Sequence, residues 1–291
     1  MTTARAQTLP VDDAKAPPES AVEVRGLNAH YGATQVLHNL ELTIRPGEIM
    51  VIMGGSGSGK STFLRHLIGL EQPSSGTIEL LGQDITKLGP VEMLDQRRRI
   101  GVAFQGGALF SSLSVAENIK LPLREHTQLD EKTMDIMARM KLEVVNLAGF
   151  GDHMPSELSG GMLKRAAVAR AIATDPKLLF FDEPSAGLDP VVSAALDELI
   201  VRLRDAMQMT IVVVTHEIHS AFKIADRITI LDQGRIVEVG TPDEVRNSPN
   251  ERIQGLLNRR PDETPLDPEE YLRRLSGDDQ GLDARMRTRH V

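Results

Sequence analysis

The chain has 291 residues with no cysteine, and 41 acidic against 33 basic residues give it a formal net charge of −8. This length suits one large or two small domains with a sizeable hydrophobic core. The absence of cysteine excludes disulfides, thiolate metal sites and a cysteine nucleophile. The acidic balance argues against a nucleic-acid binder, no apolar run approaches the ~18 residues of a membrane helix, and the N-terminus has no signal-peptide core. We therefore expect a soluble, intracellular protein.

Composition divides the chain into three parts. Residues 1–20 hold three prolines among small and charged residues, which predicts a disordered tail. Residues 21–245 carry the excess of acidic side chains and are predicted to form the main domain. Residues 246–291 hold nine Arg and nine acidic residues and are predicted to form a C-terminal extension.

Within residues 21–245, short apolar runs alternate with helical patterns. The predicted strands are 48–53, 177–182, 210–215 and 227–232, and the predicted helices are 61–70, 159–173, 193–207 and 217–225. Apolar strands that alternate with helices predict a mostly parallel sheet covered on both faces. Ligands of such sheets bind at the carboxyl ends of the strands, so the loops after each strand are the expected site.

The first of these loops reads GGSGSGKS at residues 54–61 and fits the phosphate-binding pattern G-x-x-x-x-G-K-[ST]. Its glycines allow backbone N–H groups to converge on phosphate oxygens, and the following helix adds its positive N-terminal dipole. Lys60 is expected to reach the β and γ phosphates, and the Ser61 hydroxyl to bind Mg²⁺. The alternative is a flexible glycine linker, which the flanking strand and helix disfavour.

Two patterns in the middle of the chain receive structural interpretations. Arg97, Arg98 and Arg99 could form a nucleic-acid patch, but a solvated face before the next strand is the preferred interpretation. Met134, Met137 and Met140 recur at three-residue spacing. We predict that this methionine stripe packs into the core rather than onto a partner.

Ser159, Gly160 and Gly161 open the predicted helix 159–173. A serine N-cap followed by two glycines leaves helix N–H groups accessible and predicts a second anion site. The alternative is an ordinary helix start. Two anion sites in one domain suggest a nucleotide that is bound from both sides.

Asp182 and Glu183 end the apolar strand 177–182. Asp182 is placed to hold Mg²⁺ through water, and Glu183 to act as general base on an attacking water. Alternatively, the two acids only begin a turn before Pro184.

The extension contains two capping patterns. Ser248, Pro249, Asn250 and Glu251 predict a helix through about Asn258, and residues 267–270 repeat the arrangement for a second short helix. Tyr271, Leu272 and Leu275 would form a small apolar face on that second helix. We expect this face to dock on a partner subunit; the alternative is a disordered, zwitterionic tail.

Taken in order, these motifs resemble the nucleotide-binding domain of ABC transporters over about residues 21–245. The matching segments are GGSGSGKS, Gln105, ELSGGM at 157–162, LLFFDEP at 178–184, AGLD at 186–189 and TH at 215–216. The resemblance implies an α/β P-loop NTPase (RecA-like) fold with a mostly parallel sheet core. It also implies an antiparallel β subdomain, an inserted α-helical signature subdomain at about 108–175, and a short helical C-terminal extension.

The resemblance also assigns roles. Tyr31 resembles the aromatic that stacks on adenine, Asp189 the D-loop aspartate, and Ser159 and Gly161 the signature residues that meet the γ-phosphate of the opposite subunit. The implied catalytic residues are Glu183, His216, Lys60 and Gln105, and the implied Mg²⁺ ligands are Ser61, Gln105 and Asp182. The implied ATP-binding set is Tyr31, Gly54, Gly55, Ser56, Gly57, Ser58, Gly59, Lys60, Ser61, Thr62, Gln105, Ser159, Gly160, Gly161, Asp182, Asp189 and His216. Taken alone, Tyr31 could be a turn aromatic, Gln105 a solvated amide and His216 a capping residue.

Three further features of the sequence resemble those of the ATPases of Mla/Mce-type phospholipid transporters. Met162 stands where most signatures have glutamine, and the segments 104–123 and 255–261 share this similarity. The resemblance implies an ATP- and Mg²⁺-dependent homodimer at the cytoplasmic face of the inner membrane, acting on separate permease subunits. A small regulatory subunit and a periplasmic lipid-binding Mce-type protein are further implied partners, and nucleic acid is not. The alternatives are an amino-acid or ion importer ATPase and, from another class, a soluble non-transport ABC ATPase.

Overall fold

The computed structural model describes residues 20–258, in two units that divide between Pro249 and Asn250. Of the predicted N-terminal tail, residues 1–19 lie outside the described residues. The second predicted C-terminal helix, with its capping pattern at 267–270 and its apolar face of Tyr271, Leu272 and Leu275, also lies outside them, so its docking stays a prediction. Between residues 20 and 258, no helix is long and apolar enough to cross a bilayer.

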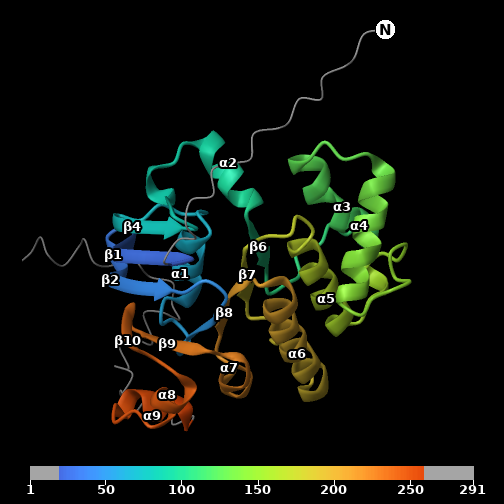
Figure 1. Cartoon of the computed structure of the whole chain (residues 1–291). Helices are drawn as coiled ribbons and strands as arrows, with labels where there is room; N and C mark the ends of the chain where they lie inside the picture. Colours follow the sequence, from blue (N-terminus) through green and yellow to red (C-terminus); the bar gives the residue numbers. More distant parts are fainter. Residues whose placement is uncertain (1–19, 259–291) are drawn as a thin grey trace, which may run out of the picture. The chain divides into compact units, whose positions relative to one another are not determined.

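A six-stranded sheet forms the centre of the first unit (Figure 1). Its strands lie in the order β10-β9-β3-β8-β7-β6, and all neighbours are parallel except β9 and β10. The bounds are β3 (Ile49–Met53), β6 (Ile100–Ala103), β7 (Leu178–Asp182), β8 (Thr210–Thr215), β9 (Arg227–Asp232) and β10 (Arg235–Gly240). The four predicted strands and the mostly parallel sheet are therefore confirmed. Their continuous apolar runs are buried on both faces, as expected for parallel strands.

A second, antiparallel sheet has the strand order β2-β1-β4-β5 and lies to one side of the first (Figure 1). Its strands are β1 (Val22–Tyr31), β2 (Thr34–Ile44), β4 (Ser75–Leu80) and β5 (Gln83–Asp84). β1 and β2 form a hairpin in which Tyr31 pairs with Thr34. Buried and exposed residues alternate at the end of β2, which is typical of a sheet with one covered face.

The hydrophobic core lies between these two sheets, with α1 (Lys60–Leu67) packed into it. Met50 and Ile52 of β3, Phe180 of β7 and Phe63 and Leu67 of α1 are all fully buried in this cluster. Burial of each such side chain contributes about 1.5–3 kcal/mol. α1 starts and ends earlier than the predicted 61–70, because Ile68 closes the helix and Gly69 follows with a φ of 67°.

The other face of the parallel sheet is covered by α5 (Gly160–Ala171), α6 (Pro190–Met207) and α7 (Ile218–Ile224), which contact β6, β8 and β3 respectively. α6 begins three residues before the predicted start at Ser193. Asp189 caps it and Pro190 occupies its first position, where proline costs no hydrogen bond. The apolar periodicity alone did not reveal this start.

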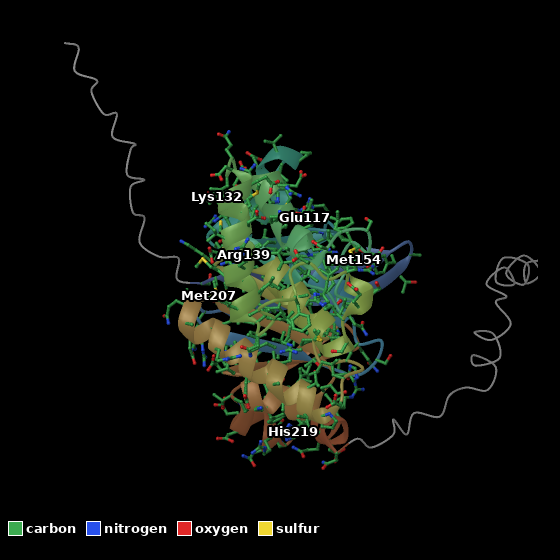
Figure 2. All side chains as sticks on the ribbon, turned by 90° about the vertical axis from the view of Figure 1, so that its right-hand side faces the viewer. Glu117, Lys132, Arg139, Met154, Met207 and His219 are labelled. Atoms are coloured by element: carbon green, nitrogen blue, oxygen red, sulfur yellow. The ribbon has the colours of Figure 1, made fainter. Side chains whose placement is uncertain are left out.

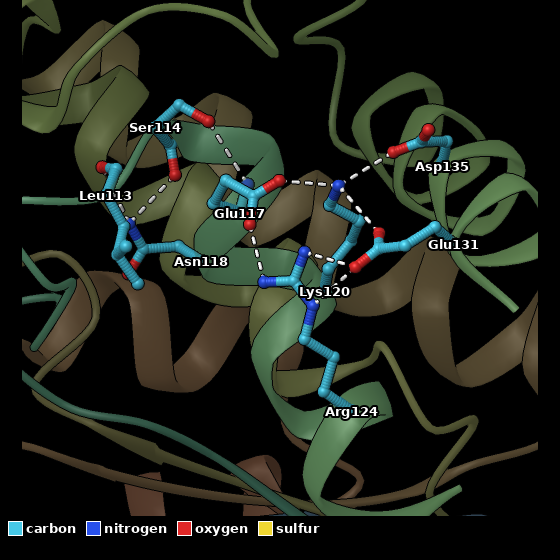
Figure 3. Close-up of polar contacts among 8 residues, drawn as sticks. All are labelled: Leu113, Ser114, Glu117, Asn118, Lys120, Arg124, Glu131 and Asp135. Atoms are coloured by element: carbon cyan, nitrogen blue, oxygen red, sulfur yellow. Dashed lines mark hydrogen bonds and ion pairs between the residues drawn. The ribbon is translucent and has the colours of Figure 1, made fainter. Parts of the chain in front are cut away.

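α3 (Val115–His126) and α4 (Glu131–Val144) pack on α5 and form a helical group (Figures 1 and 2). The ammonium of Lys120, in α3, lies 2.8 Å from Asp135 and 3.2 Å from Glu131, both in α4 (Figure 3). These contacts raise the pKa of Lys120 against the opposing effect of burial. The ion pairs join the two helices across their polar edge.

The predicted methionine stripe on α4 is only partly buried. Met134 is buried, whereas Met140 is 59% exposed. Three residues turn an α-helix by about 300°, so a three-residue repeat drifts off one face by about 60° per step. The buried face instead follows the four-residue repeat of Met134, Ala138 and Leu142. The core interpretation was therefore wrong for Met140.

The remaining elements are short. They are η1 (Ile85–Lys87), α2 (Pro90–Arg98), η2 (Pro155–Glu157), α8 (Pro242–Arg246) and, in the second unit, α9 (Glu251–Leu257). Arg97, Arg98 and Arg99 are exposed around the end of α2 and bond to Gly69 O, Asp95 and Gln96, which agrees with a solvated face.

The first C-terminal helix starts later than predicted. Asn250, not Ser248, is its N-cap, and the Asn250 side chain accepts a hydrogen bond from the N–H of Arg252. The Ser248 hydroxyl instead donates to Glu238 of β10. The predicted capping box was therefore wrong by two residues, because a long-range contact takes the serine.

Candidate functional site

The loops after four parallel strands bring the predicted site residues to one edge of the sheet. β3 leads into the loop at Gly54, β6 toward Gln105, β7 into Glu183 and β8 into His216. Because these strands are parallel neighbours in the order β3-β8-β7-β6, their carboxyl ends lie side by side. Such an edge is where α/β sheets bind ligands.

The loop of residues 54–59 passes tightly against the end of β9. A Cβ on Gly54 would lie 2.1 Å from the carbonyl oxygen of Leu231, so only glycine fits. Gly59 has a φ of 101° and is the N-cap of α1, with no side chain to cap the helix. The first N–H groups of α1 therefore lack side-chain acceptors, which is the arrangement that binds phosphate.

Lys60 is buried, and its ammonium donates to the carbonyls of Gly54 at 2.9 Å and Gly55 at 2.8 Å. Burial lowers its pKa, while the carboxylates of Glu183 and Asp182 oppose this shift. The lysine charge is thus held inside the curve of its own loop, close to both acids. Ser61, the next residue, is exposed.

The turn between β9 and β10 supports the back of this loop. The N–H of Gly234 donates to Ser58 O at 2.9 Å, and Gly234 O accepts from the N–H of His38 at 2.8 Å. A Cβ on Gly234 would lie 1.9 Å from Val36 O. Strand β2, the turn and the glycine-rich loop therefore form one continuous hydrogen-bonded stack.

Asp182 and Glu183 stand at the end of β7. Burial raises the pKa of Asp182, and the negative charge of Glu183 adds to the shift, while Arg65, Lys164 and Lys60 oppose it. Glu183 has a φ of 46°, in the left-handed region that non-glycine residues seldom occupy. Its N–H donates to Val214 O at 2.8 Å.

The Glu183 carboxylate contacts the residues at the end of β8. One oxygen lies 2.9 Å from Nδ1 of His216, and the other accepts from the Thr215 hydroxyl at 3.2 Å. The His216 ring is 55% exposed, so one side of this pair is open to solvent. An aimed carboxylate beside an accessible imidazole can accept a proton and orient a polar ligand.

The predicted second anion site lies at the start of α5. Ser159 is its N-cap as predicted, with its hydroxyl accepting from the N–H of Met162 at 3.3 Å. Ser159 and Gly160 are exposed. In the described part of the chain, no hydrogen bond or ion pair joins Ser159, Gly160 or Gly161 to residues 54–62.

Tyr31, Gln105 and Asp189 are also exposed, and among the described residues no hydrogen bond or ion pair joins them to Glu183. The Tyr31 hydroxyl donates to Glu71, in the loop after α1, at 2.6 Å. The Asp189 carboxylate accepts from the N–H groups of Val191 and Val192, both at 3.1 Å. In this conformation Asp189 therefore acts as a helix cap.

The predicted metal ligands carry the right chemistry for Mg²⁺. Ser61, Gln105 and Asp182 offer a hydroxyl, an amide and a carboxylate oxygen, which a hard cation prefers. Residues 20–258 contain no cluster of three His, Cys, Asp or Glu side chains that could hold a metal alone. Mg²⁺ characteristically binds one or two carboxylates together with substrate phosphates, so these donors fit it.

Two residues at the site were not predicted from the sequence. Thr215 is fully buried and bonds to the Glu183 carboxylate, and it stands next to His216 in the TH pair that signalled the site. Lys164 of α5 bonds to the main chains of Gln105 and Glu183. No local pattern identified Lys164, because its partners are distant in sequence.

Comparisons with known proteins agree with this geometry. The ABC transporter family profile matches residues 37–186. The chain is 41% identical to the intermembrane phospholipid transport ATP-binding protein MlaF of Haemophilus influenzae, over 82% of this chain and 90% of that protein. It is 39% identical to the probable ribonucleotide transport ATP-binding protein mkl of Mycobacterium tuberculosis (strain CDC 1551 / Oshkosh), over 82% and 67%.

Solved structures of ABC cassettes also superpose on this chain. An ATP-binding cassette solved as a post-hydrolysis dimer with ADP and Pi superposes with a TM-score of 0.71 at 31% identity, over 76% of this chain and 98% of that one. The cbiO1 protein of Clostridium perfringens, part of the ABC transporter complex cbiONQ, superposes with a TM-score of 0.74 at 28% identity, over 88% and 100%. The chain belongs to the ABC transporter family, as its ATP-binding, ATP-hydrolysing subunit.

Proposed function

We propose that the residues at the sheet edge bind MgATP in the roles that the sequence predicts. Lys60 and the N–H groups at the start of α1 bind the β and γ phosphates, and Tyr31 stacks on adenine. Ser61, Gln105 and Asp182 would hold Mg²⁺, whose chemistry is to neutralise charge on the β and γ phosphates. The glycine-rich loop against Leu231 and the ammonium of Lys60 support this assignment.

In hydrolysis, Glu183 accepts the proton of the attacking water and His216 holds the γ-phosphate. The support is the 2.9 Å contact between His216 Nδ1 and Glu183 Oε1, which fixes both groups at the edge. Thr215 orients the other carboxylate oxygen at 3.2 Å. The arrangement positions the base before substrate arrives, which reduces the reorganisation needed in the transition state.

The active form is a homodimer in which each ATP contacts two subunits. Exposed Ser159 and Gly160 make no hydrogen bond or ion pair with residues 54–62 of their own chain within the described residues, so they are available to a partner's nucleotide. The similar post-hydrolysis cassette was solved as a dimer. Residues 246–291 are proposed to strengthen this dimer, and truncation after Arg260 should then weaken association.

Mixing two inactive variants tests the shared site. Ser159→Arg blocks the contribution of the signature residues to each site, and Lys60→Ala removes the phosphate-binding lysine from each site. A dimer of either variant alone therefore has no working site. A mixed dimer contains one site with intact Lys60 and intact Ser159, and ATPase activity should reappear on mixing. If the mixture stays as inactive as its components, or if either variant alone hydrolyses ATP as a monomer, the composite site is wrong.

The subunit powers phospholipid transport from the cytoplasmic face of the inner membrane, through separate permease subunits. The observation that carries this is the similarity to MlaF, at 41% identity over 90% of that protein. Met162 and the segment 104–123 agree with it. A small regulatory subunit and a periplasmic lipid-binding Mce-type protein are the further proposed partners.

Relatives named for ribonucleotide transport have similar identity, 39% over 82% of this chain, and make ribonucleotides the second candidate. Chromosomal Lys60→Ala in the source organism separates the two. Phospholipid transport predicts a changed envelope lipid distribution and greater detergent sensitivity. Normal lipid distribution with impaired ribonucleotide uptake would favour the second candidate, and impaired amino-acid or ion uptake the importer alternative.

A further inference from the structure

Lys164, in the second turn of α5, bonds to two main-chain carbonyls in the loops that follow two neighbouring strands of the sheet. Its ammonium donates to Gln105 O at 2.5 Å and to Glu183 O at 3.2 Å. Within residues 20–258, no other side chain bonds to both of these residues. One ammonium therefore joins the loop after β6 to the loop after β7.

Glu183 needs such support because of its backbone. Its φ of 46° is a strained conformation, which persists only where the surroundings hold it. The N–H is held by Val214 O, and the carbonyl accepts from Ala186 N–H at 3.2 Å as well as from Lys164. Val214 and Ala186 make these contacts with main-chain atoms, whereas Lys164 uses its side chain. Lys164 belongs to α5, the helix whose N-cap is Ser159.

The loop after Gln105 is held mainly by the helical group. Arg170 of α5 donates to Ala108 O at 2.6 Å and Gly107 O at 3.2 Å. The buried Asn118 side chain of α3 binds the main chain of Phe110. It also donates to the carbonyls of Leu113 and Ser114, which lie beside it in Figure 3. The loop beyond Gln105 is therefore anchored on α3 and α5, whereas Gln105 itself is bonded by Lys164, which also bonds to Glu183.

We propose that Lys164 is a positioning residue for ATP hydrolysis, which sets the Glu183 main chain relative to Gln105 and α5. The proposal rests on the role of Glu183 as general base. The position of the ammonium agrees with this proposal, because the nearby negative charges of Asp182 and Glu183 stabilise the positive charge of Lys164. They oppose the fall in the Lys164 pKa that burial causes.

The test compares three variants of the full chain in a steady-state ATPase assay. Lys164→Met keeps the apolar stem and removes the donors, and Lys164→Arg restores donors to both carbonyls. Arg170→Met is the matched control, because Arg170 lies on the same helix and binds the same loop but not Glu183. Thermal unfolding and ATP binding are measured alongside.

We expect Lys164→Met to lower kcat by about tenfold or more with KM changed less than about twofold, because the loss falls on the transition state. Lys164→Arg should recover most of kcat, and Arg170→Met should change kcat less than about threefold. An unchanged kcat in Lys164→Met, no recovery in Lys164→Arg, or an equal loss in Arg170→Met would overturn the proposal.

Glu183→Gln in the same assay separates this inference from the proposed function. If Glu183→Gln abolishes turnover while Lys164→Met does not, the base role stands and the positioning role fails. If Glu183→Gln turns over ATP normally, the base role itself fails, whatever the lysine variants show.

Discussion

His216 Nδ1 lies 2.9 Å from Oε1 of Glu183, and on its other side His216 Nε2 lies 3.5 Å from Glu217. The imidazole is thus placed between two carboxylates of unequal burial, since the side chain of Glu183 is 13% exposed and that of Glu217 is 40% exposed. Glu183, the more buried of the two acids, also accepts a hydrogen bond from the Thr215 hydroxyl. Geometry therefore distinguishes the two acids as partners of one histidine.

Glu183→Gln should abolish most ATP turnover. The amide keeps the size of the side chain but cannot accept the water proton, and loss of a general base typically costs about 10²–10⁴-fold in rate. ATP binding should persist, because Lys60 and the glycine-rich loop are unchanged. The measurement is single-turnover hydrolysis together with equilibrium ATP binding.

Glu217→Gln is the matched control, since it changes the exposed carboxylate beside the same histidine. Its turnover should stay within about threefold of the unmodified chain, because it keeps the contact of His216 with Glu183. Comparable losses in the two variants would show that the histidine environment, rather than a specific base, limits the rate.

Lys60→Met should weaken nucleotide binding itself. Charge-assisted hydrogen bonds contribute about 1.5–3 kcal/mol, so Kd for ATP should rise by about 10–100-fold. Lys87→Met removes an exposed lysine that pairs with Asp84 and provides the control, with an unchanged Kd. Titration with a fluorescent ATP analogue measures both values, and a Lys60→Met Kd equal to that of the control would contradict the assignment.

Gly54→Ala should destabilise the fold more than Gly55→Ala. The new methyl group at position 54 would lie 2.1 Å from Leu231 O, whereas at position 55 no atom lies within 4 Å. We expect a loss of about 2 kcal/mol or more for the first and under about 1 kcal/mol for the second. Urea unfolding measures both, and equal values would show that the loop relaxes without cost.

Asp197→Asn should stabilise the protein at neutral pH. Burial between α6 and α7 raises the pKa of Asp197 above its usual 3.8, although the Ser220 hydroxyl donates to it at 3.1 Å. An acid with a raised folded-state pKa is stabilising only when protonated, so its contribution falls as the pH rises above 3.8.

The asparagine variant keeps an acceptor for Ser220 without the charge. It should gain on the order of 1 kcal/mol at pH 7 and nothing at a pH well below 3.8, where both states of the original acid are protonated. Urea unfolding across this range measures the difference. A gain that does not depend on pH would assign the effect to packing instead.

Local pattern sufficed for the predicted strands and for the glycine-rich loop. The continuous apolar runs of β3, β7, β8 and β9 identified a parallel sheet, and its topology then placed Gly54, Glu183 and His216 at one edge. Features that depend on distant partners were not predictable in this way. Ser248, for example, bonds to Glu238 instead of capping the helix. The error at Met140 has a local cause, because a three-residue repeat drifts off one face of an α-helix.

The site shows the same division. Sequence indicated Glu183 and His216 separately, but their 2.9 Å contact arises because β7 and β8 are neighbours in the sheet. Lys164 was not predicted from the sequence because it binds main-chain carbonyls, which every residue type has. Side chains that recognise a neighbouring backbone leave no paired signal in a single sequence.

The contacts behind the glycine-rich loop also bear on the order in which the protein is made. The carbonyl of Ser58 accepts its hydrogen bond from Gly234, and Gly54 is fitted against Leu231. A chain emerging from the ribosome therefore carries its glycine-rich loop for about 175 residues before the support for that loop is synthesised. Nascent chains that stop short of Gly234 lack this support, so under the proposed role of the loop in binding phosphates the site is completed only late in translation.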